Sequence, residues 1–284
     1  MKLSFTHKDG VGQLHLLKNE KSFEQNFFEQ KDGLHFHTIA WNLGACQTVT
    51  IDEVKYPFEA NSILPIMLNQ SFSFEKPEDI VAWQFNRDFY CIVNHDVEVG
   101  CVGFIFFGPS PTMFVKLSTA DVEMMQLLLK VFEEEFSVNE EIKEEMLRIL
   151  LVRLIIMVTR LAKKQYLGTS EVAEKKFNLI RQFYLLVEIH FRKEHQVQFY
   201  AGLLHKSPKT ISNYFALYYK KSPLQVIAER IITEAKRLFY YTDKSVKEVA
   251  DELGFEDVAH FSKFFKNYTS QSPSELKKVS APTK

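Results

Sequence analysis

The sequence predicts a multidomain α+β protein, in which an N-terminal antiparallel β-barrel with a helix pair precedes an all-α domain containing two helix-turn-helix units. Three observations favour this fold class. The chain has 284 residues, more than one hydrophobic core usually organises. Residues 1 to about 115 form short β-branched and aromatic runs, and the apolar period becomes helical from Ser118 onward. The last hundred residues contain the same helix-turn-helix pattern twice.

The N-terminal strands are indicated by apolar runs that end at turn residues. These runs are residues 35–43, 46–51, 62–68, 80–85 and 99–107. Short strands at this spacing are typical of an antiparallel barrel or sandwich.

A helix pair over about 118–165 follows the strands. Ser118 to Asp121 is a helix start, and an apolar stripe continues through Val122, Met125, Leu128, Leu129 and Phe132. The second helix, from residue 140 to about 165, is acidic in its first turns and basic in its last, which complements the helix dipole.

The middle of this second helix is apolar on almost every face. One sheet face and one neighbouring helix would leave part of it in water, so we expect a second subunit to cover it. The alternative is that the barrel alone buries it. The residues expected at this dimer contact are Leu147, Leu150, Leu151, Leu154, Ile155 and Val158.

Several classes of protein are disfavoured. The first 17 residues have no continuous apolar core, unlike a secretory signal, and the longest apolar run, residues 149–158, is too short to span a bilayer. Cys46, Cys91 and Cys101 lack a metal-ligand spacing, which favours reduced thiols. We therefore expect a cytoplasmic protein with no membrane contact.

Charge divides the chain. Residues 1–174 carry 16 Lys+Arg and 25 Asp+Glu, and residues 175–284 carry 19 and 11, so the net charge of -1 conceals parts of -9 and +8. A basic part that also contains two helix-turn-helix patterns predicts double-stranded DNA as the partner.

The C-terminal part, residues 176–279, follows a linker at 166–175, and residues 1–165 precede the linker as the domain expected to dimerise. Its two units are residues 199–215 and 246–266. A connecting helix starts after Ser222-Pro223 and runs over about 223–240, with Leu224, Ile227, Ile231, Ala235 and Leu238 as its inward stripe. Its length of about 25 Å can hold two reading helices about one DNA turn, roughly 34 Å, apart.

This C-terminal part resembles the AraC/XylS-type bacterial transcription regulators over about a hundred residues. The residues that carry the resemblance are Ala201, Arg230, Ala235, Ala250, Gly254, Phe255, Asp257, Phe261, Phe265, Lys266 and Ser272-Pro273. It implies that each module's second helix enters a major groove and that the N-terminal domain is cupin-like and binds a small effector. Effector binding would then alter either DNA occupancy or a contact with RNA polymerase. Lys220 and Ser270 stand where such proteins usually have a helix-ending glycine, at a cost on the order of 1 kcal/mol each.

Outward positions of the reading helices follow from the helical period and the family pattern. The residues expected to face bases are Lys209, Ser212, Asn213, Val258, Ala259, His260 and Lys263. The residues expected at phosphates are Lys206, Thr210, Lys220, Lys221, Lys266 and Thr269. Any base-facing residue could instead meet only phosphate, because half or more of protein–DNA hydrogen bonds go to the backbone.

The N-terminal pocket is less clearly marked. His35, His37 and Trp41 share one face of an expected strand, and Trp83 lies in another, so these four residues are candidates for an effector pocket. A metal site needs further ligands, and no Glu or His follows at a recognisable spacing, so we expect neither a metal nor another cofactor.

Three hypotheses remain. The preferred one is a dimeric, sequence-specific DNA-binding transcription regulator that is not an enzyme. The alternatives are a metal-dependent cupin enzyme with a DNA-binding tail, and an assembly protein with incidental basic charge.

Overall fold

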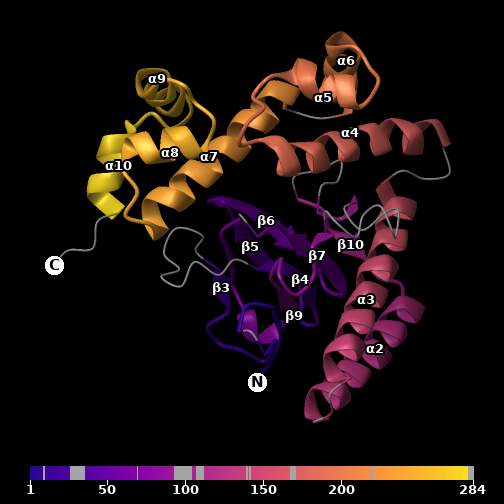
Figure 1. Ribbon diagram of the computed structural model, residues 1–284. Helices are drawn as coiled ribbons and strands as arrows, with labels where there is room; N and C mark the ends of the chain where they lie inside the picture. Colours follow the sequence, from indigo (N-terminus) through magenta and orange to yellow (C-terminus); the bar gives the residue numbers. More distant parts are fainter. Residues whose placement is uncertain are drawn as a thin grey trace. The chain divides into compact units, whose positions relative to one another are not determined.

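The computed structural model forms two compact units that meet in the chain between Ser170 and Glu171 (Figure 1). It describes residues 1–280 except 9, 26–35, 69, 93–103, 107–111, 139, 141, 167–170 and 219–220. Of the expected linker 166–175, Tyr166 ends a helix, Glu171 begins the next, and residues 167–170 lie outside the described part.

The first unit contains two antiparallel sheets. In spatial order, the strands of the larger sheet are β1 (Lys2–Thr6), β2 (Gln13–Lys18), β9 (Ile80–Phe85), β4 (His37–Asn42), β7 (Ser62–Ile66) and β10 (Val115–Lys116). Those of the smaller sheet are β3 (Glu24–Gln25), β8 (Phe72–Phe74), β5 (Gln47–Ile51) and β6 (Val54–Phe58). A short 3-10 helix, η1 (Pro77–Asp79), leads into β9.

The fold class is confirmed, but the closed barrel is wrong for the described strands. The larger sheet ends at β1 and β10 and the smaller at β3 and β6, with no strand ladder between the sheets. A shared apolar core, which includes Ala40 and Ala82 of the larger sheet and Val49 and Phe58 of the smaller, joins the two layers instead. Side chains rather than backbone hydrogen bonds therefore hold the sheets together.

Strands and sequence runs agree unevenly. The run 80–85 coincides with β9, and β4, β5 and β7 lie within the runs expected for them. The run 99–107 is corrected in its described portion, because Phe104 to Phe106 form a helical turn rather than a strand. These three side chains are buried, and a short apolar run does not by itself distinguish a strand from a buried turn.

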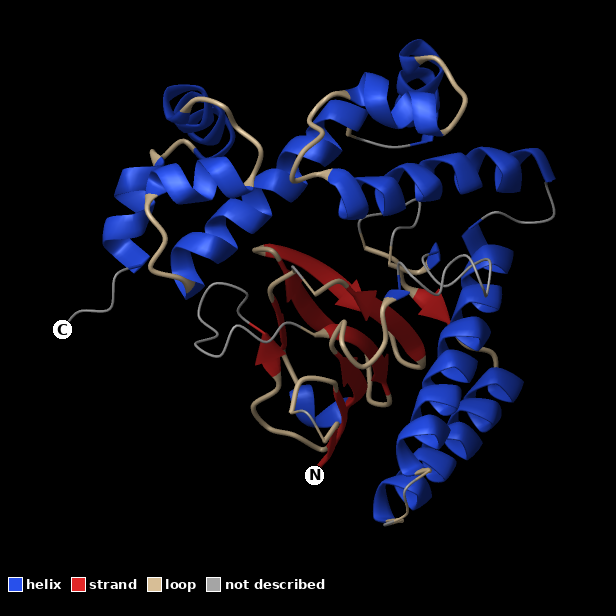
Figure 2. Ribbon diagram, viewed as in Figure 1, coloured by secondary structure: helices blue, strands red, loops and turns tan. Residues whose placement is uncertain are grey.

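The helix pair consists of α2 (Thr119–Ser137) and α3 (Lys143–Tyr166), which Figure 2 shows side by side along the strands. A capping box starts α2, since the Ser118 hydroxyl accepts from the Asp121 N–H and the Asp121 carboxylate accepts from the Ser118 N–H. The Phe132 ring of α2 lies 5.7 Å from that of Trp83 in β9. The helix pair thus covers the outer face of the larger sheet.

The second unit is all-helical. Its helices are α4 (Glu171–His190), α5 (Val197–Leu203), α6 (Pro208–Tyr218), α7 (Pro223–Tyr241), α8 (Val246–Glu252), α9 (Val258–Thr269) and α10 (Pro273–Ser280). Figure 1 shows α7 running between the pair α5 and α6, here called module 1, and the pair α8 and α9, module 2.

The connecting helix α7 begins as expected and buries most of its expected stripe. Ser222 and Gln225 form a capping box with Pro223 in the first turn. Ile227, Ile231, Ala235 and Leu238 belong to the core shared with both modules. Leu224 is corrected, because it is 52% exposed. It lies in the first turn, where α7 has not yet entered the core.

Among the described helices, none combines the length and the apolar character needed to cross a bilayer.

Candidate nucleic-acid interface

The turn of module 1 is closed by backbone hydrogen bonds. The His205 N–H donates to the Gly202 carbonyl at 3.0 Å and the Lys206 N–H to the Ala201 carbonyl at 2.9 Å. His205 has a φ of 52°, in the left-handed region, and its side chain is exposed. This geometry reverses the chain between α5 and α6.

Module 2 repeats the same turn. The Gly254 N–H donates to the Asp251 carbonyl at 3.1 Å and the Phe255 N–H to the Ala250 carbonyl at 2.9 Å. Gly254 has a φ of 74°. The two turns therefore share one backbone conformation, with histidine at the left-handed position in one and glycine in the other.

The reading helix of module 1 is α6. Ser207 precedes it and its hydroxyl accepts from the Thr210 N–H at 3.1 Å, which satisfies one free donor of the first turn. Ile211 and Phe215 are 1% exposed and hold the helix to its module. Its outward residues Lys209, Ser212 and Asn213, predicted to face bases, are exposed.

The reading helix of module 2 is α9. The Asp257 carboxylate accepts from the Ala259 N–H at 3.0 Å and caps it. Phe261 and Phe265 are fully buried. The four positions predicted to face bases differ in exposure. Val258 is half-buried, whereas Ala259, His260 and Lys263 are exposed.

The predicted phosphate contacts fall into groups. Lys206 and Lys266 are exposed. Lys221 forms an ion pair with Glu229 at 2.7 Å, and the Thr269 hydroxyl donates toward the carbonyls of Phe265 and Gln271, so both already have partners within the chain.

Two further phosphate predictions concern the helix ends. Thr210 is half-buried, and its hydroxyl lies 2.8 Å from that of Ser207. Lys220 lies outside the described residues. Ser270 ends α9 in the left-handed conformation that glycine usually adopts, with a φ of 61°, although it lacks the glycine that such helix ends usually have.

An ion network that joins α7 to the residues just after α4 was not predicted. Glu234 is 3% exposed and accepts hydrogen bonds from Arg192 at 2.6 Å, Arg237 at 2.7 Å and Arg230 at 3.2 Å. Burial alone would raise the pKa of Glu234, but the hydrogen bond from Arg237 and the neighbouring arginine charges outweigh it and lower the pKa to about 2. The sequence did carry a sign of this network, because Arg230, Glu234 and Arg237 are spaced three and four residues apart, where side chains of one helix can form ion pairs.

The expected pocket residues of the first unit lie elsewhere than anticipated. His37 and Trp41 lie on the same face of β4, and Trp83 of the neighbouring strand lies on that face as well. The contact between Trp83 and Phe132 shows that this face of the sheet packs against α2. Trp41 and Trp83 are fully buried. These side chains therefore belong to the core between sheet and helices, not to the space between the sheets, and His35 lies outside the described residues.

His37 is enclosed by aromatic rings. Its ring stacks on Phe85 at 5.4 Å and meets the edge of Phe106 at 4.8 Å. Burial, followed by the charge of Arg87, lowers the pKa of His37 to about 3, so the ring is neutral. In the part of the chain that the structure describes, no group of three potential metal ligands occurs.

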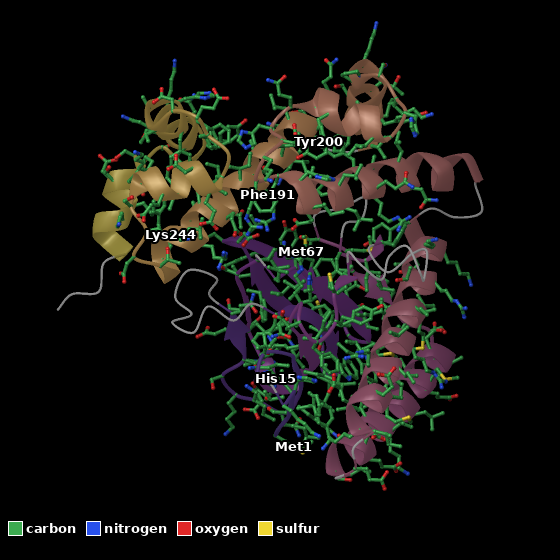
Figure 3. All side chains as sticks on the ribbon, in the orientation of Figure 1. Met1, His15, Met67, Phe191, Tyr200 and Lys244 are labelled. Atoms are coloured by element: carbon green, nitrogen blue, oxygen red, sulfur yellow. The ribbon has the colours of Figure 1, made fainter. Side chains whose placement is uncertain are left out.

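Polar residues do face the space between the sheets, and sequence reasoning missed them. His15 and Gln84 are opposite each other in the register and share faces with the core residues Leu17 and Ala82. Gln84 donates to the Thr38 hydroxyl at 3.1 Å. The pKa of His15 is lowered to about 4, mainly by burial and further by the charge of Lys2. Figure 3 labels this residue.

The predicted dimer residues of α3 are corrected. Leu147, Leu151, Leu154, Ile155 and Val158 are fully buried within one chain, and Leu150 is 7% exposed. Their burial within the single chain favours the alternative to a second subunit, although α2 packs against α3 in addition to the strands.

Other apolar side chains of the same helices are exposed. We call them the apolar stripe: Met124, Leu127 and Val131 of α2 and Met146 and Ile149 of α3, between 39% and 60% exposed. An Arg153 Nη2 to Met124 Sδ distance of 3.8 Å shows that the two rows adjoin.

These features define a protein with two helix-turn-helix modules on one connecting helix. Residues 200–278 match the family described as "Helix-turn-helix domain", which confirms the resemblance for this part of the chain. The uncharacterized HTH-type transcriptional regulator YdiP of Escherichia coli (strain K12) is 28% identical over 104 residues, 37% of this chain and 34% of that protein. The HTH-type transcriptional activator RhaS of Enterobacter sp. (strain 638) is 28% identical over 98 residues, 34% of this chain and 35% of that protein.

The chain thus spans about a third of the length of these curated relatives. Among solved structures, ToxT from Vibrio cholerae O395, bound to (E)-4-(8-methylnaphthalen-1-yl)but-3-enoic acid, is 14% identical with a TM-score of 0.44, over 99% of this chain and 98% of that one.

Proposed function

We propose that this protein is a sequence-specific DNA-binding transcription regulator and not an enzyme. One observation carries the proposal. Each of two helix-turn-helix modules presents exposed polar side chains on the first turns of its second helix, while the inward side of that helix is buried. Helix-turn-helix proteins read the major groove with these positions. The net charge of +8 in residues 175–284 favours the phosphate backbone as partner.

The proposed base contacts are Lys209, Ser212 and Asn213 in α6 and Ala259, His260 and Lys263 in α9, with Val258 in apolar contact. Asn213 has the donor and acceptor that adenine requires, and Lys209 and Lys263 can donate to guanine. Lys206 and Lys266, which are exposed, are the strongest phosphate candidates.

A second copy of the chain is the proposed occupant of the apolar stripe. The first turn of α3 carries Glu144 and Glu145, and its last turn carries Lys163 and Lys164. A two-fold axis that pairs α3 helices antiparallel would place the acidic end of one opposite the basic end of the other. Burying five exposed apolar side chains on each copy supplies the favourable free energy.

A small effector stays a prediction from the family resemblance. A contact with RNA polymerase stays a prediction as well, and so does a cytoplasmic location, which was expected from the N-terminal sequence and the cysteines. An effector between the two sheets would meet His15, Gln84 and Thr38, and its binding would shift the population of DNA-binding conformations.

The function is tested by selecting DNA from a random pool with the full-length protein at about 150 mM salt, where non-specific phosphate binding is weak. The expected result is a bipartite site with two short motifs about one helical turn apart. The control is the double variant Lys209→Ala with Lys263→Ala, which should relax the base preference at one position in each motif. Binding without enrichment by the wild-type protein would refute sequence-specific regulation and favour the assembly hypothesis.

A further inference from the structure

The two reading helices are joined by more than α7. The segment Phe191–His195, which follows α4 and which we call the bridging segment, contacts module 1, α7 and module 2. Figure 3 labels Phe191 and Tyr200 near the point where α4, α5 and α7 meet.

Module 1 and α7 hold one side of the bridging segment. The Tyr200 hydroxyl of α5 donates to the Glu194 carbonyl at 2.6 Å, and Tyr200 itself is fully buried. The Arg192 guanidinium donates to the buried carboxylate of Glu234 in α7 at 2.6 Å. These two bonds fix the bridging segment relative to α5 and α7, the helices against which α6 packs.

Module 2 contacts the other side. The His195 ring lies 4.6 Å from that of Phe255, which is 5% exposed and lies 5.1 Å from Phe261 and 5.2 Å from Phe264 of α9. The bridging segment is therefore one aromatic ring away from the second reading helix.

The closest approach is at Gly254. A Cβ atom there would lie 3.3 Å from the carbonyl carbon of Arg192 and 3.2 Å from the Cα of Lys193, and it would overlap the Arg192 carbonyl oxygen. These atoms belong to the backbone, so no side-chain movement relieves the overlap.

Comparison of the two modules separates this contact from the turn itself. Both turns have the same hydrogen bonds and a left-handed residue, yet module 1 has His205 at that position. The turn therefore accepts a Cβ atom. What requires glycine in module 2 is the bridging segment beside it.

We propose that the bridging segment locks the two modules into one rigid reading unit and sets the half-site spacing that the protein accepts, with Gly254 as the positioning residue that permits the contact. The spacing part of this inference rests on the proposed function. The rigidity part does not require DNA.

The rigidity of the two modules relative to each other is measured by double electron–electron resonance spectroscopy on the full-length protein. Spin labels are attached at Ala216→Cys in α6 and Asn267→Cys in α9, both exposed positions outside the proposed base contacts, with Cys46, Cys91 and Cys101 changed to serine. The wild-type background should show one narrow distance distribution, and Gly254→Asn should broaden or shift it. Asparagine tolerates the left-handed conformation, so the variant tests the added Cβ.

His205→Asn is the matched control, because it places the same residue in the equivalent turn away from the bridging segment. It should leave the distribution narrow. His195→Ala, which removes a contact without adding an overlap, should also broaden it, and this variant guards against misfolding of Gly254→Asn. An unchanged distribution in both Gly254→Asn and His195→Ala, or equal broadening in the His205→Asn control, would overturn the lock.

Spacing is measured on the selected bipartite site with one base pair inserted between its motifs, which moves one motif by about 3.4 Å and turns it by about 34°. The inserted base pair should lower the affinity of the wild-type protein about tenfold, equivalent to about 1.4 kcal/mol. It should lower the affinity of the His195→Ala variant clearly less. Equal losses would overturn the spacing role. A narrow distance distribution without any bipartite site would instead refute the proposed function and leave the lock standing.

Discussion

The guanidinium carbon of Arg230 lies 3.9 Å from the centre of the Phe191 ring, and its Nε donates to both carboxylate oxygens of Glu188 at 2.9 Å. Arg230 also bonds to Glu234, so one α7 side chain joins two acidic residues and an aromatic ring. This arrangement attaches α4 to the helix that carries both modules.

Replacing this arginine should destabilise the helical unit. Arg230→Ala leaves Glu188 and Glu234 without their shared partner, and breaking a buried pair in this way costs about 3 kcal/mol. Urea unfolding followed by helical circular dichroism measures the loss. Lys221→Ala is the control, since Lys221 and Glu229 are 41% and 47% exposed and such a pair contributes at most about 1 kcal/mol. Equal losses in the two variants would contradict the role of Arg230.

Acid should weaken the same unit through Glu234. Its pKa is about 2 in the folded protein against 4.5 in the unfolded chain, so the unfolded state binds more protons in this range. The stabilisation is therefore complete above pH 4.5 and is lost as pH falls toward 2, by about 3 kcal/mol in total. Unfolding of wild-type and Glu234→Gln protein is compared between pH 6 and 3. The two should differ less as pH falls, and a constant difference would contradict the assignment.

His37 should make the first unit sensitive to acid at higher pH. Its pKa is about 3 in the fold and 6.5 when unfolded, so protons bind preferentially to the unfolded chain below pH 6.5. This residue alone should cost up to about 1.4 kcal/mol per pH unit as pH falls. The test compares wild-type protein with His37→Phe, which preserves the ring, by thermal unfolding at pH 7 and pH 5. The variant should gain relative stability at pH 5, and parallel losses would show that His37 is not the group.

The apolar stripe should control self-association. Leu127→Glu combined with Ile149→Glu places charge on side chains that are 60% and 54% exposed in the single chain, so folding should change little while a dimer is disrupted. Sedimentation velocity at micromolar concentration measures the oligomeric state. Gln126→Glu, on an exposed position of α2 outside the stripe, is the control and should remain dimeric. A wild-type monomer, or an unaffected double variant, would rule out this surface.

A lysine of the second reading helix should discriminate bases. Lys263→Ala should lower affinity by about 1–3 kcal/mol and relax the preference at one position of the site. Lys266→Ala should instead weaken all sequences similarly, as expected for a phosphate contact. Binding to the selected site and to each of its single-base variants distinguishes the two. An unchanged preference in Lys263→Ala would place that lysine at a phosphate.

The start of α7 and the inward side of α6 were predictable because both depend on residues that are close together in the sequence. The cap of α7 is formed by sequence neighbours, namely Ser222, Pro223 and Gln225. In α6, the buried residues Ile211 and Phe215 are four positions apart with exposed polar residues between them, and this spacing shows which side of the helix faces its module. The paired modules were therefore recognisable without coordinates.

The sequence alone determined the division into a strand-rich and a helical part, the helix starts and the outward residues of α6 and α9. The tertiary structure decided which apolar residues remain exposed. A strand or helix that is apolar on both sides carries no periodic signal, so neither the direction of Trp41 in β4 nor the burial of Leu151 in α3 could be read from spacing. It also decided why Gly254 is glycine, because the Arg192 backbone beside it comes from 62 residues earlier in the chain, and only folding brings such distant segments into contact.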